Sequence, residues 1–524
     1  MLGKTFATGS DLWPNRPVFQ PKSIKRCNNL RRDIGDASLG VARTVEVKFV
    51  SNVVAKRLIS CTVINHTSKQ VKPSTSTPSV INYSSKLVKP STPTPTIHRF
   101  YKISFTDELA PTVYVPLILY YSSPPDGPNG LDKNICDHLE DSLSNTLSEF
   151  YPLAGRFIRN QSLIDCNDQG VLYVLGKANV PVSYIVGLEH GLKPDVLNDF
   201  LPREIGEADD LNDPMLCIKV TTFECGGFAI GMLFSHRLSD MGTMCNFINN
   251  WAARSIGEYD NKEYSPIFNA PVNFPKRGLP ELDLRLPRSS VNVKITAQRF
   301  VFSGEAISAM REKIGFDQNS GSRKPSKVQL VVALLWKALV RMDQVKNGQS
   351  KASFLIQPVG LRDKVVPPLP ANSFGNFWGL ATSQLTPGEG DKMELLEFFK
   401  ILHGSIKKTA VDCAKILTHG EEGYGVIINP YLESNRKIGD NDVNFYLMTT
   451  WCKFSFYNAD FGCGKPIWTS TGKLPGQNLV VTMDDHKGDG VEAWVHLDDK
   501  RMKELEQDSD IKTYATYIAL ASLI

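Results

Sequence analysis

The stretch from Phe228 to Gly257 constrains the fold of this chain most. Residues 228–234 form a continuous apolar run, short enough for a buried strand, and residues 235–240 are a polar break. From Met241 onward apolar side chains recur at helical spacing until Gly257. The pattern predicts a strand, a tight turn and a helix. Such a turn would present its one histidine, His236, to a cleft.

Composition describes a well-cored chain with no disulfide framework. The 524 residues are 42% apolar, which suggests roughly two to four domains. No run of about 18 apolar residues predicts a transmembrane helix, and the first residues lack a secretory signal. Ten scattered cysteines form no CxxC pair, which favours reduced thiols over disulfides or a zinc site. We therefore expect a cytoplasmic protein without a metal or a membrane contact.

Charge is divided unevenly along the chain. Residues 1–100 carry 16 Lys and Arg against 4 Asp and Glu, whereas the other 424 residues carry 43 against 51. A mildly acidic body lacks the phosphate-neutralising excess that nucleic-acid binding needs. We expect no nucleic-acid partner.

The N-terminal region contains a duplicated block. SKQVKPSTSTPSV at 68–80 returns as SKLVKPSTPTPTI at 85–97, and its Pro, Ser and Thr content favours extended, poorly packed backbone. The basic segment before it could be a targeting leader or a disordered extension. Asp33, Asp36 and the lack of an amphipathic helix favour the extension. We expect residues 1–84 to be dispensable, so that a chain beginning near Ser85 folds.

The body alternates strands and helices, which predicts an α/β (α+β) protein in layers. The stretch 258–292 is rich in Pro and suggests a crossover between an N-terminal domain, 85–275, and a C-terminal domain, 293–524, with 276–292 as the connecting loop. Expected strands lie at 112–121, 170–175, 217–223, 298–302, 353–359, 443–449, 479–483 and 490–497, and expected helices at 132–151, 303–314, 326–343, 391–417 and 501–507.

His236 is a candidate general base, because an imidazole with a pKa near 6.5 can remove a proton from a hydroxyl near neutral pH. A histidine at the end of a strand is equally often a capping or surface group. Apolar neighbours on both sides favour the catalytic interpretation. Asp240 could hold the ring, as in a triad, or tie down the turn, and the spacing does not decide between these roles.

Other catalytic chemistries have weaker support. Ser235 adjoins the histidine, but no GxSxG elbow holds it as a nucleophile. HExxH, P-loop and GxGxxG motifs are absent from the sequence. Cys452 and Cys463 have no basic partner in sequence, which favours inert thiols. The Gly-rich loop at 460–466 is interpreted as structural, with Asp460 forming a salt bridge or capping a turn.

Several segments together resemble a known family. His236-Arg237-Leu238-Ser239-Asp240 matches the HxxxD motif of the plant BAHD acyltransferases, and Asp460-Phe461-Gly462-Cys463-Gly464 matches their DFGWG motif. The segments FYPLAGR, DCNDQGV, VQLVVALLWK, PPLPANSFGN and GDGVEAWV follow the family in order. The resemblance covers residues 85–524 and is strongest to alkaloid O-acetyltransferases.

The resemblance implies a two-domain fold of the chloramphenicol-acetyltransferase type with a channel between the domains. It implies transfer of an acyl group, most simply acetyl, from acyl-CoA to a hydroxyl of a specialised metabolite such as an indole alkaloid. His236 would be the base, and Asp240 would pair with Arg362. The family implies that no metal or bound prosthetic group is needed. Nothing in the sequence indicates an obligate oligomer, so we expect a monomer. By the same correspondence, the oxyanion and acyl pocket would contain Thr449 and Trp451, and the CoA site Ser326, Lys327, Gly375 and Asn376.

Departures from the family pattern leave alternatives open. Cys463 replaces the usual tryptophan, and Gly360 stands where similar sequences have Asn. Donors with aromatic acyl groups are one alternative, and a non-catalytic relative that acts as a binding protein is another. The retained His236 and Asp240 favour an enzyme.

Overall fold

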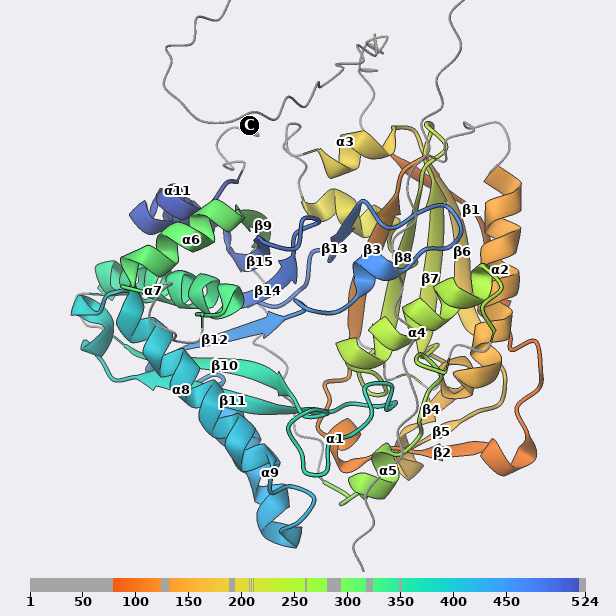
Figure 1. Cartoon of the computed structure of the whole chain (residues 1–524), viewed down its shortest axis with the longest axis horizontal. Coiled ribbons are helices and arrows are strands. Elements are labelled where there is room, and N and C mark those ends of the chain that lie inside the picture. Colours follow the sequence, from red (N-terminus) through yellow and green to blue (C-terminus); the bar gives the residue numbers. More distant parts are fainter. Residues whose placement is uncertain are drawn as a thin grey trace, which may run out of the picture. The chain divides into compact units, whose positions relative to one another are not determined.

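The first of two large sheets is built mainly from the N-terminal half of the chain. The computed structural model describes residues 79–123, 132–187, 194–206, 208, 210, 212–259, 262–279, 294–316, 324–347 and 351–517. Within these, six strands form this sheet (Figure 1), in the order β1 (Val80–Val88), β6 (Val171–Ala178), β7 (Leu216–Thr222), β8 (Phe228–Ser235), β3 (Tyr114–Tyr121) and β13 (Trp468–Ser470).

The second sheet comes from the C-terminal half and also has six strands. Their order is β11 (Trp378–Leu385), β10 (Ala352–Gly360), β12 (Val443–Thr450), β14 (Leu479–Asp484), β15 (Val491–Asp498) and β9 (Ile295–Phe302). A small third sheet joins β2 (Phe100–Lys102), β5 (Leu163–Asp165) and β4 (Arg156–Ile158). The predicted α/β architecture in two halves is confirmed.

Helices cover the first sheet because their apolar residues repeat along one side. In α2 (Asp132–Glu149), Leu139, Leu143 and Leu147 are fully buried at i, i+4 and i+8. They pack in one core cluster with apolar residues of α4 (Met241–Ser255), and the two helices lie side by side against the strands (Figure 1).

The second sheet is packed by helices of its own half. The apolar helix α7 (Lys327–Asn347) is buried against β15 and against α8 (Leu395–Cys413). Along β15, Val491, Ala493 and Val495 enter this cluster, whereas Trp494 belongs to the first, as the two-residue period of a strand requires. The remaining helices are α1 (Phe105–Glu108), α3 (Val182–Val186), α5 (Ala270–Asn273), α6 (Gly304–Lys313), α9 (Gly420–Lys437), α10 (Asp499–Gln507) and α11 (Ser509–Tyr514).

Two segments cross between the halves, and the division into domains near residue 293 stays a prediction. β13 belongs by sequence to the C-terminal half but pairs with β3 of the first sheet, through Trp468 opposite Tyr120. Conversely, Phe105 of α1 packs in a cluster with Phe354 and Phe445 of the second sheet. The predicted connecting loop lies largely outside the described residues, which stop at 279 and resume at 294.

The predicted N-terminal boundary at Ser85 falls inside a strand. β1 begins at Val80 and pairs antiparallel with β6, from Val80 opposite Ala178 to Val88 opposite Val171. The expected extended backbone of the duplicated block is therefore partly correct, but five of its residues, Val80 and Ser85 to Val88, belong to the first sheet. The leader itself, up to residue 78, lies outside the described residues.

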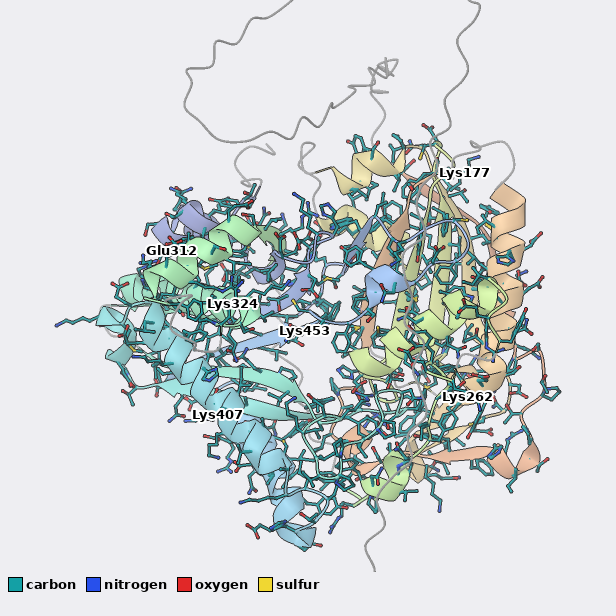
Figure 2. The ribbon with its side chains drawn as sticks, in the orientation of Figure 1. Lys177, Lys262, Glu312, Lys324, Lys407 and Lys453 are labelled. Atoms are coloured by element: carbon teal, nitrogen blue, oxygen red, sulfur yellow. The ribbon has the colours of Figure 1, made fainter. Side chains whose placement is uncertain are left out.

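Charged side chains lie exposed on several elements of both halves. Figure 2 labels exposed side chains on separate elements, including Lys177 on β6, Glu312 on α6 and Lys407 on α8. Eight cysteines fall within the described residues, and none of these is in a disulfide. Among the described helices, none is both long enough and apolar enough to cross a membrane.

Candidate active site

Strand β8 delivers His236 to the end of the first sheet. The strand is buried along its whole length between β7 and β3, and Gly231 in its middle allows close packing. A Cβ at that position would lie 1.9 Å from the carbonyl oxygen of Phe200. The backbone N–H of His236 donates to the carbonyl of Val113 at 3.0 Å, which holds the first residue after the strand in line with it.

Asp240 starts the helix behind the turn. Its side chain accepts a hydrogen bond from the N–H of Thr243 at 2.8 Å, as an N-cap residue does. The strand, turn and helix predicted from the sequence are all present.

The carboxylate of Asp240 is fully occupied by an arginine and by backbone. Arg362 donates through Nη1 to Oδ2 at 2.7 Å and through Nη2 to Oδ1 at 2.9 Å, and Phe377 N–H also donates to Oδ2 at 2.9 Å. Burial would raise the pKa of Asp240, but Arg362 and the backbone donors outweigh burial and lower it. The pairing with Arg362 implied by the resemblance is present. Of the two roles left open for Asp240, its contacts match the one that ties down the turn.

The ring of His236 is held by Asn376. Nδ1 of His236 lies 3.1 Å from Oδ1 of Asn376, while Nδ2 of the same amide donates to the carbonyl of His236 at 2.9 Å and to Oδ1 of Asp107 at 2.8 Å. Because the amide nitrogen faces two acceptors, the amide oxygen faces the ring. That oxygen accepts, so Nδ1 carries the ring proton and Nε2 keeps its lone pair.

The environment of the ring favours the neutral base. Burial lowers the pKa of His236 below its ordinary value, against smaller opposing effects of hydrogen bonds and of the Asp240 charge. Trp378, at the start of β11, lies with its ring centroid 6.2 Å from the imidazole. The sequence did not single out Trp378, because a tryptophan that opens a strand carries no catalytic signal.

Asp107 was also missed. It lies in α1, is 0% exposed, and accepts hydrogen bonds from both the backbone N–H and the side-chain amide of Asn376. Burial raises its pKa to about 6, although Ser104 and Asn376 donate to it and lower the pKa in part. The only sequence signal was the Ser104-x-x-Asp107 spacing, which is typical of a capping box.

Two residues assigned to the CoA site by resemblance are engaged inside the protein. Asn376 is 0% exposed, and buried Gly375 has a φ of +128°, which favours glycine. The carbonyl of Gly375 accepts from Thr243 Oγ1 at 2.8 Å and from Arg362 at 3.2 Å. These contacts place both residues in the network that supports the catalytic turn, and their assignment to the CoA site stays a prediction.

Lys327 is assigned to a CoA phosphate by resemblance, and this assignment stays a prediction. Its ammonium group forms an ion pair with Asp484 at 2.7 Å and donates to the carbonyls of Gly488 and Gly490 at 2.7 and 2.9 Å. The positive charge is thus already neutralised by a carboxylate. Ser326 directly precedes α7 and is half-buried, so its contact with CoA stays a prediction.

Thr449 and Trp451 lie at the end of β12, in the middle of the second sheet. Thr449 is half-buried and pairs with Val481 of β14, and the N–H of Trp451 donates to the carbonyl of Thr482 at 2.7 Å. Trp451 packs in the core cluster of the first half, so the two sheets meet here. Their place in an oxyanion or acyl pocket stays a prediction.

The Asp460 loop is built as a structural turn. Oδ1 of Asp460 accepts from the N–H groups of Gly462 and Gly464 at 2.8 and 2.9 Å, and both glycines have positive φ. Phe461 packs edge-on against Trp251 of α4, with ring centroids 4.8 Å apart. The predicted turn-capping role of Asp460 is confirmed. Half-buried Cys463 packs against the core cluster of the first half.

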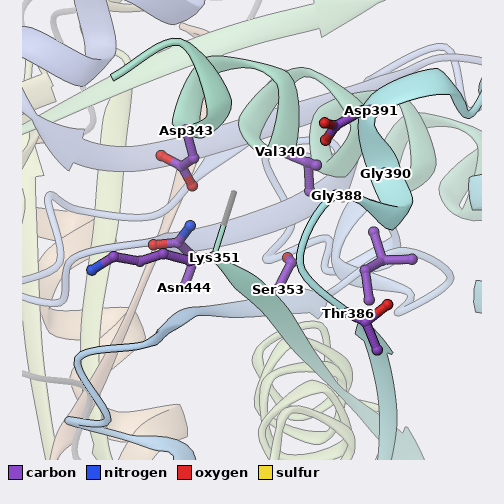
Figure 3. A pocket seen from close by; sticks show the side chains of 10 residues that line it. Val340, Asp343, Lys351, Ser353, Thr386, Gly388, Gly390, Asp391 and Asn444 are labelled. Carbon is purple, nitrogen blue, oxygen red and sulfur yellow. The ribbon is translucent and has the colours of Figure 1, made fainter. Parts of the chain in front are cut away.

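A small pocket lies elsewhere on the second half (Figure 3). It is lined from α7, β10 and the turn after β11 by residues that include Asp343, Ser353 and Asp391, and its cavity volume is only about 10 Å³. Asp343 is already paired with Arg501 at 2.8 Å. None of the residues that line it belongs to the predicted active site.

Comparison with known proteins agrees with this geometry. Residues 79–511 match the model of the Transferase family. The chain is 34% identical to vinorine synthase of Rauvolfia serpentina over 77% of this chain and 91% of that one. It is 32% identical to a pelargonidin-glucoside malonyltransferase of Salvia splendens, over 85% of this chain and 98% of that one.

Solved structures give the same fold. The crystal structure of vinorine synthase superposes with a TM-score of 0.70 at 30% identity, covering 83% of this chain and 98% of that one. TRI101 of F. graminearum, solved with coenzyme A and T-2 mycotoxin, superposes with a TM-score of 0.64 at 16% identity, covering 80% and 99%. The two sheets and the helices packed on them therefore form the two-domain fold of chloramphenicol-acetyltransferase-like acyltransferases.

The chain belongs to the Transferase family of plant BAHD acyltransferases. It is an acyltransferase, and the family uses acyl-CoA as the donor.

Proposed function

We propose that this acyltransferase moves an acetyl group from acetyl-CoA to a hydroxyl group of a plant specialised metabolite, such as an indole alkaloid, with His236 as general base. The observation that carries the proposal is the state of the imidazole. Its Nδ1 lies against Asn376 and its residue is half-buried, and in the proposed reaction Nε2 is the nitrogen that accepts the proton.

The reaction is a direct transfer without an acyl-enzyme. Nε2 of His236 takes the proton of the acceptor hydroxyl as its oxygen bonds to the thioester carbonyl carbon. The tetrahedral oxyanion then collapses, the carbon–sulfur bond breaks, and the CoA thiolate leaves with the proton from the imidazolium. One base thus serves both steps, because the proton that it removes is the one that the leaving group needs.

The surrounding residues support the base in this scheme. Asp240 and Arg362 fix the turn through a bidentate ion pair. Because the Asp240 carboxylate also accepts from the backbone N–H of Phe377, we assign it no direct role on the substrate. Thr449 and Trp451, at the end of β12, are proposed to border the oxyanion and acyl group, and Ser326 to contact CoA. No bound prosthetic group or metal enters the scheme, and we propose a cytoplasmic monomer.

The names of similar proteins favour an alkaloid acceptor. Besides vinorine synthase, the chain is 31% identical to stemmadenine O-acetyltransferase of Catharanthus roseus and 32% identical to akuammiline synthase 1 of Alstonia scholaris. Limonoid acetyltransferases of Melia azedarach and Citrus sinensis are about as similar, at 32%. An acetyl donor is common to most of these names, whereas the acceptor skeleton varies.

A malonyl donor is the second candidate, because the malonyltransferase of Salvia splendens is as similar as the acetyltransferases. A malonyl group carries a carboxylate that needs a cation near its binding place. Arg362, the arginine of the catalytic network, already neutralises Asp240, which favours an uncharged acyl group. Aromatic acyl donors are tested in the same experiment.

The test supplies purified protein with acetyl-CoA, malonyl-CoA or p-coumaroyl-CoA and a panel of hydroxylated indole alkaloids and limonoids. We expect CoA release together with acceptor products heavier by one acetyl group, and loss of both in His236→Ala. Product formed by His236→Ala at the wild-type rate would refute the base. Binding of acetyl-CoA without turnover of any acceptor would favour a non-catalytic binding protein.

A further inference from the structure

The aspartate of the HxxxD motif does not hold the catalytic ring. Both of its carboxylate oxygens are taken by Arg362, Thr243 N–H and Phe377 N–H, at 2.7 to 2.9 Å. The ring must be positioned by other groups. Its nearest polar side-chain partner is Asn376, which approaches from a segment 140 residues further along the chain.

An amide can position an imidazole only if its own orientation is fixed. If Asn376 were turned over, its Nδ2 would face the ring and its oxygen would face two acceptors, the carbonyl of His236 and the carboxylate of Asp107. In the observed orientation both acceptors receive N–H bonds, at 2.9 and 2.8 Å. The carboxylate is therefore one of the two groups that decide which end of the amide meets His236.

Asp107 makes more contacts than its short helix requires. Oδ2 accepts from the N–H and the hydroxyl of Ser104 at 2.8 and 2.7 Å, which completes the capping box of α1. Oδ1 makes no contribution to the cap. It accepts from the backbone N–H and Nδ2 of Asn376 at 2.9 and 2.8 Å, across 269 residues of sequence.

The carboxylate is kept at a fully buried place, where a charge is costly. Asp107 is 0% exposed, and burial raises its pKa to about 6 despite four donors. An asparagine could cap the same turn without this cost. What asparagine cannot do is accept on both sides at once, toward Ser104 and toward Asn376.

We propose that Asp107 is a positioning residue of the active site: through Asn376 it fixes the orientation of His236 and keeps the proton of the ring on Nδ1. A series of hydrogen bonds joins the Asp107 carboxylate, the Asn376 amide and the His236 imidazole. This series positions the ring, which the HxxxD aspartate does not contact through a hydrogen bond. This proposal rests on the proposed role of His236 as base.

The test compares Asp107→Asn with Glu108→Gln, a neighbouring change in the same helix. Glu108 also accepts two backbone bonds, from Arg277 and Gly278, but has no bond to Asn376. With acetyl-CoA and the panel acceptor that turns over fastest, we expect Asp107→Asn to lower kcat about 10- to 100-fold with little change in KM, because a misplaced base loses rate rather than binding. Glu108→Gln is expected to keep the wild-type kcat.

A second measurement separates positioning from folding. Nitrogen-15 NMR of histidine-labelled protein reports the tautomer of His236, with its signals assigned by their loss in His236→Gln. We expect one Nδ1-protonated form in the wild type and in Glu108→Gln, and a mixture of tautomers in Asp107→Asn. A purely structural role would lower the melting temperature without a change of tautomer.

Should Asp107→Asn not fold, Asn376→Ala removes the same series of hydrogen bonds and leaves the capping box of α1 intact. Where both variants fold, the double variant is expected to lose no more rate than the more severe single variant. If the loss of rate in the double variant instead equals the product of the losses in the two single variants, the proposal is overturned. If His236→Ala is inactive while Asp107→Asn matches the wild type in rate and tautomer, the positioning role fails and the proposed function stands. If His236→Ala stays active, both fail.

Discussion

The pair of Asp240 and Arg362 joins the two halves of the site through one buried carboxylate. Asp240 is 8% exposed and starts α4, whereas Arg362 comes from the segment after β10. Arg362 also donates to the carbonyls of Ser373 and Gly375, in the segment directly before Asn376. One guanidinium therefore links the catalytic turn to the segment that carries Asn376. Removing it would leave a buried charge and two buried carbonyls without that partner.

Arg362→Ala should therefore lower the free energy of unfolding by about 3–5 kcal/mol, because it leaves the Asp240 carboxylate buried and unpaired. Urea unfolding followed by circular dichroism measures this loss. Arg203→Ala is the matched control, since Arg203 forms a similar pair with Asp213 at 2.9 Å but is 42% exposed. It should cost no more than about 1 kcal/mol. Equal losses in the two variants would contradict the role of burial.

Activity should fall at an unusually low pH on the acid side. Burial lowers the pKa of His236 below 6.5, so the neutral base persists in solutions somewhat more acidic than an exposed histidine would tolerate. The acid limb of kcat/KM, which reports the free enzyme, should therefore have its midpoint below pH 6.5. The same shift removes stability as the pH falls through 6.5, because the unfolded state binds the proton more tightly. A midpoint above 6.5 would contradict the burial of the base.

At the scale of residues, the sequence predicted contacts between residues that lie close together in the chain. His236, Asp240 and the helix after them are neighbours in the chain, and Asp460 meets its two glycine donors within four residues. Asn376 and Asp107 could not be placed, because Asn376 lies 140 residues from His236 in the chain and Asp107 lies 269 residues from Asn376. Only the resemblance singled out Asn376, as a CoA contact, and its bond to His236 was not predicted.

At the scale of elements, β1 contributes one buried side chain to an edge of the first sheet. Val88 is 5% exposed, whereas most of the strand faces solvent. A chain that begins at Ser79 should keep the melting temperature and activity of the full chain. A chain that begins at Lys89 should be less stable by about 1.5–3 kcal/mol, the value of burying one valine. The start at Ser85 predicted from the sequence should lie between these, nearer to Ser79. Thermal unfolding of the three chains tests the order, and loss of folding in the Ser79 chain would contradict it.

Elements were predicted where the apolar pattern was strong and missed where breakers interrupted it. Helix α9 contains Pro430 in its interior and begins at Gly420, both of which argue against a helix from sequence. Its burial through Ile427 and Tyr431, against the cluster that includes Phe105, outweighs those preferences. β11 follows a loop rich in Pro and Gly, and its pairing with β10, 18 to 32 residues away along the chain, is what makes it a strand.

At the scale of the whole molecule, the two sheets are joined by β13. Its backbone extends the first sheet beside β3, while Trp468 reaches the second. The indole Nε1 donates to Glu492 of β15 at 3.2 Å, and the guanidinium of Arg299 of β9 lies 4.6 Å from the ring centroid. The ring also stacks on Tyr120 of β3, with centroids 5.0 Å apart. One side chain therefore contacts both halves between which the reaction is proposed to occur.

Trp468→Ala should destabilise both sheets, by about 3–5 kcal/mol, because it removes a 5% exposed aromatic ring and leaves the 6% exposed Glu492 without its indole donor. Trp468→Phe keeps an aromatic ring against Tyr120 and Arg299, so it should lose only the hydrogen bond and cost about 1–3 kcal/mol. Hydrogen exchange locates the effect: amides of β3 and of β15 should lose protection together in Trp468→Ala. Loss confined to β3 would show that Trp468 stabilises the first sheet alone, and that the halves are held together by other contacts.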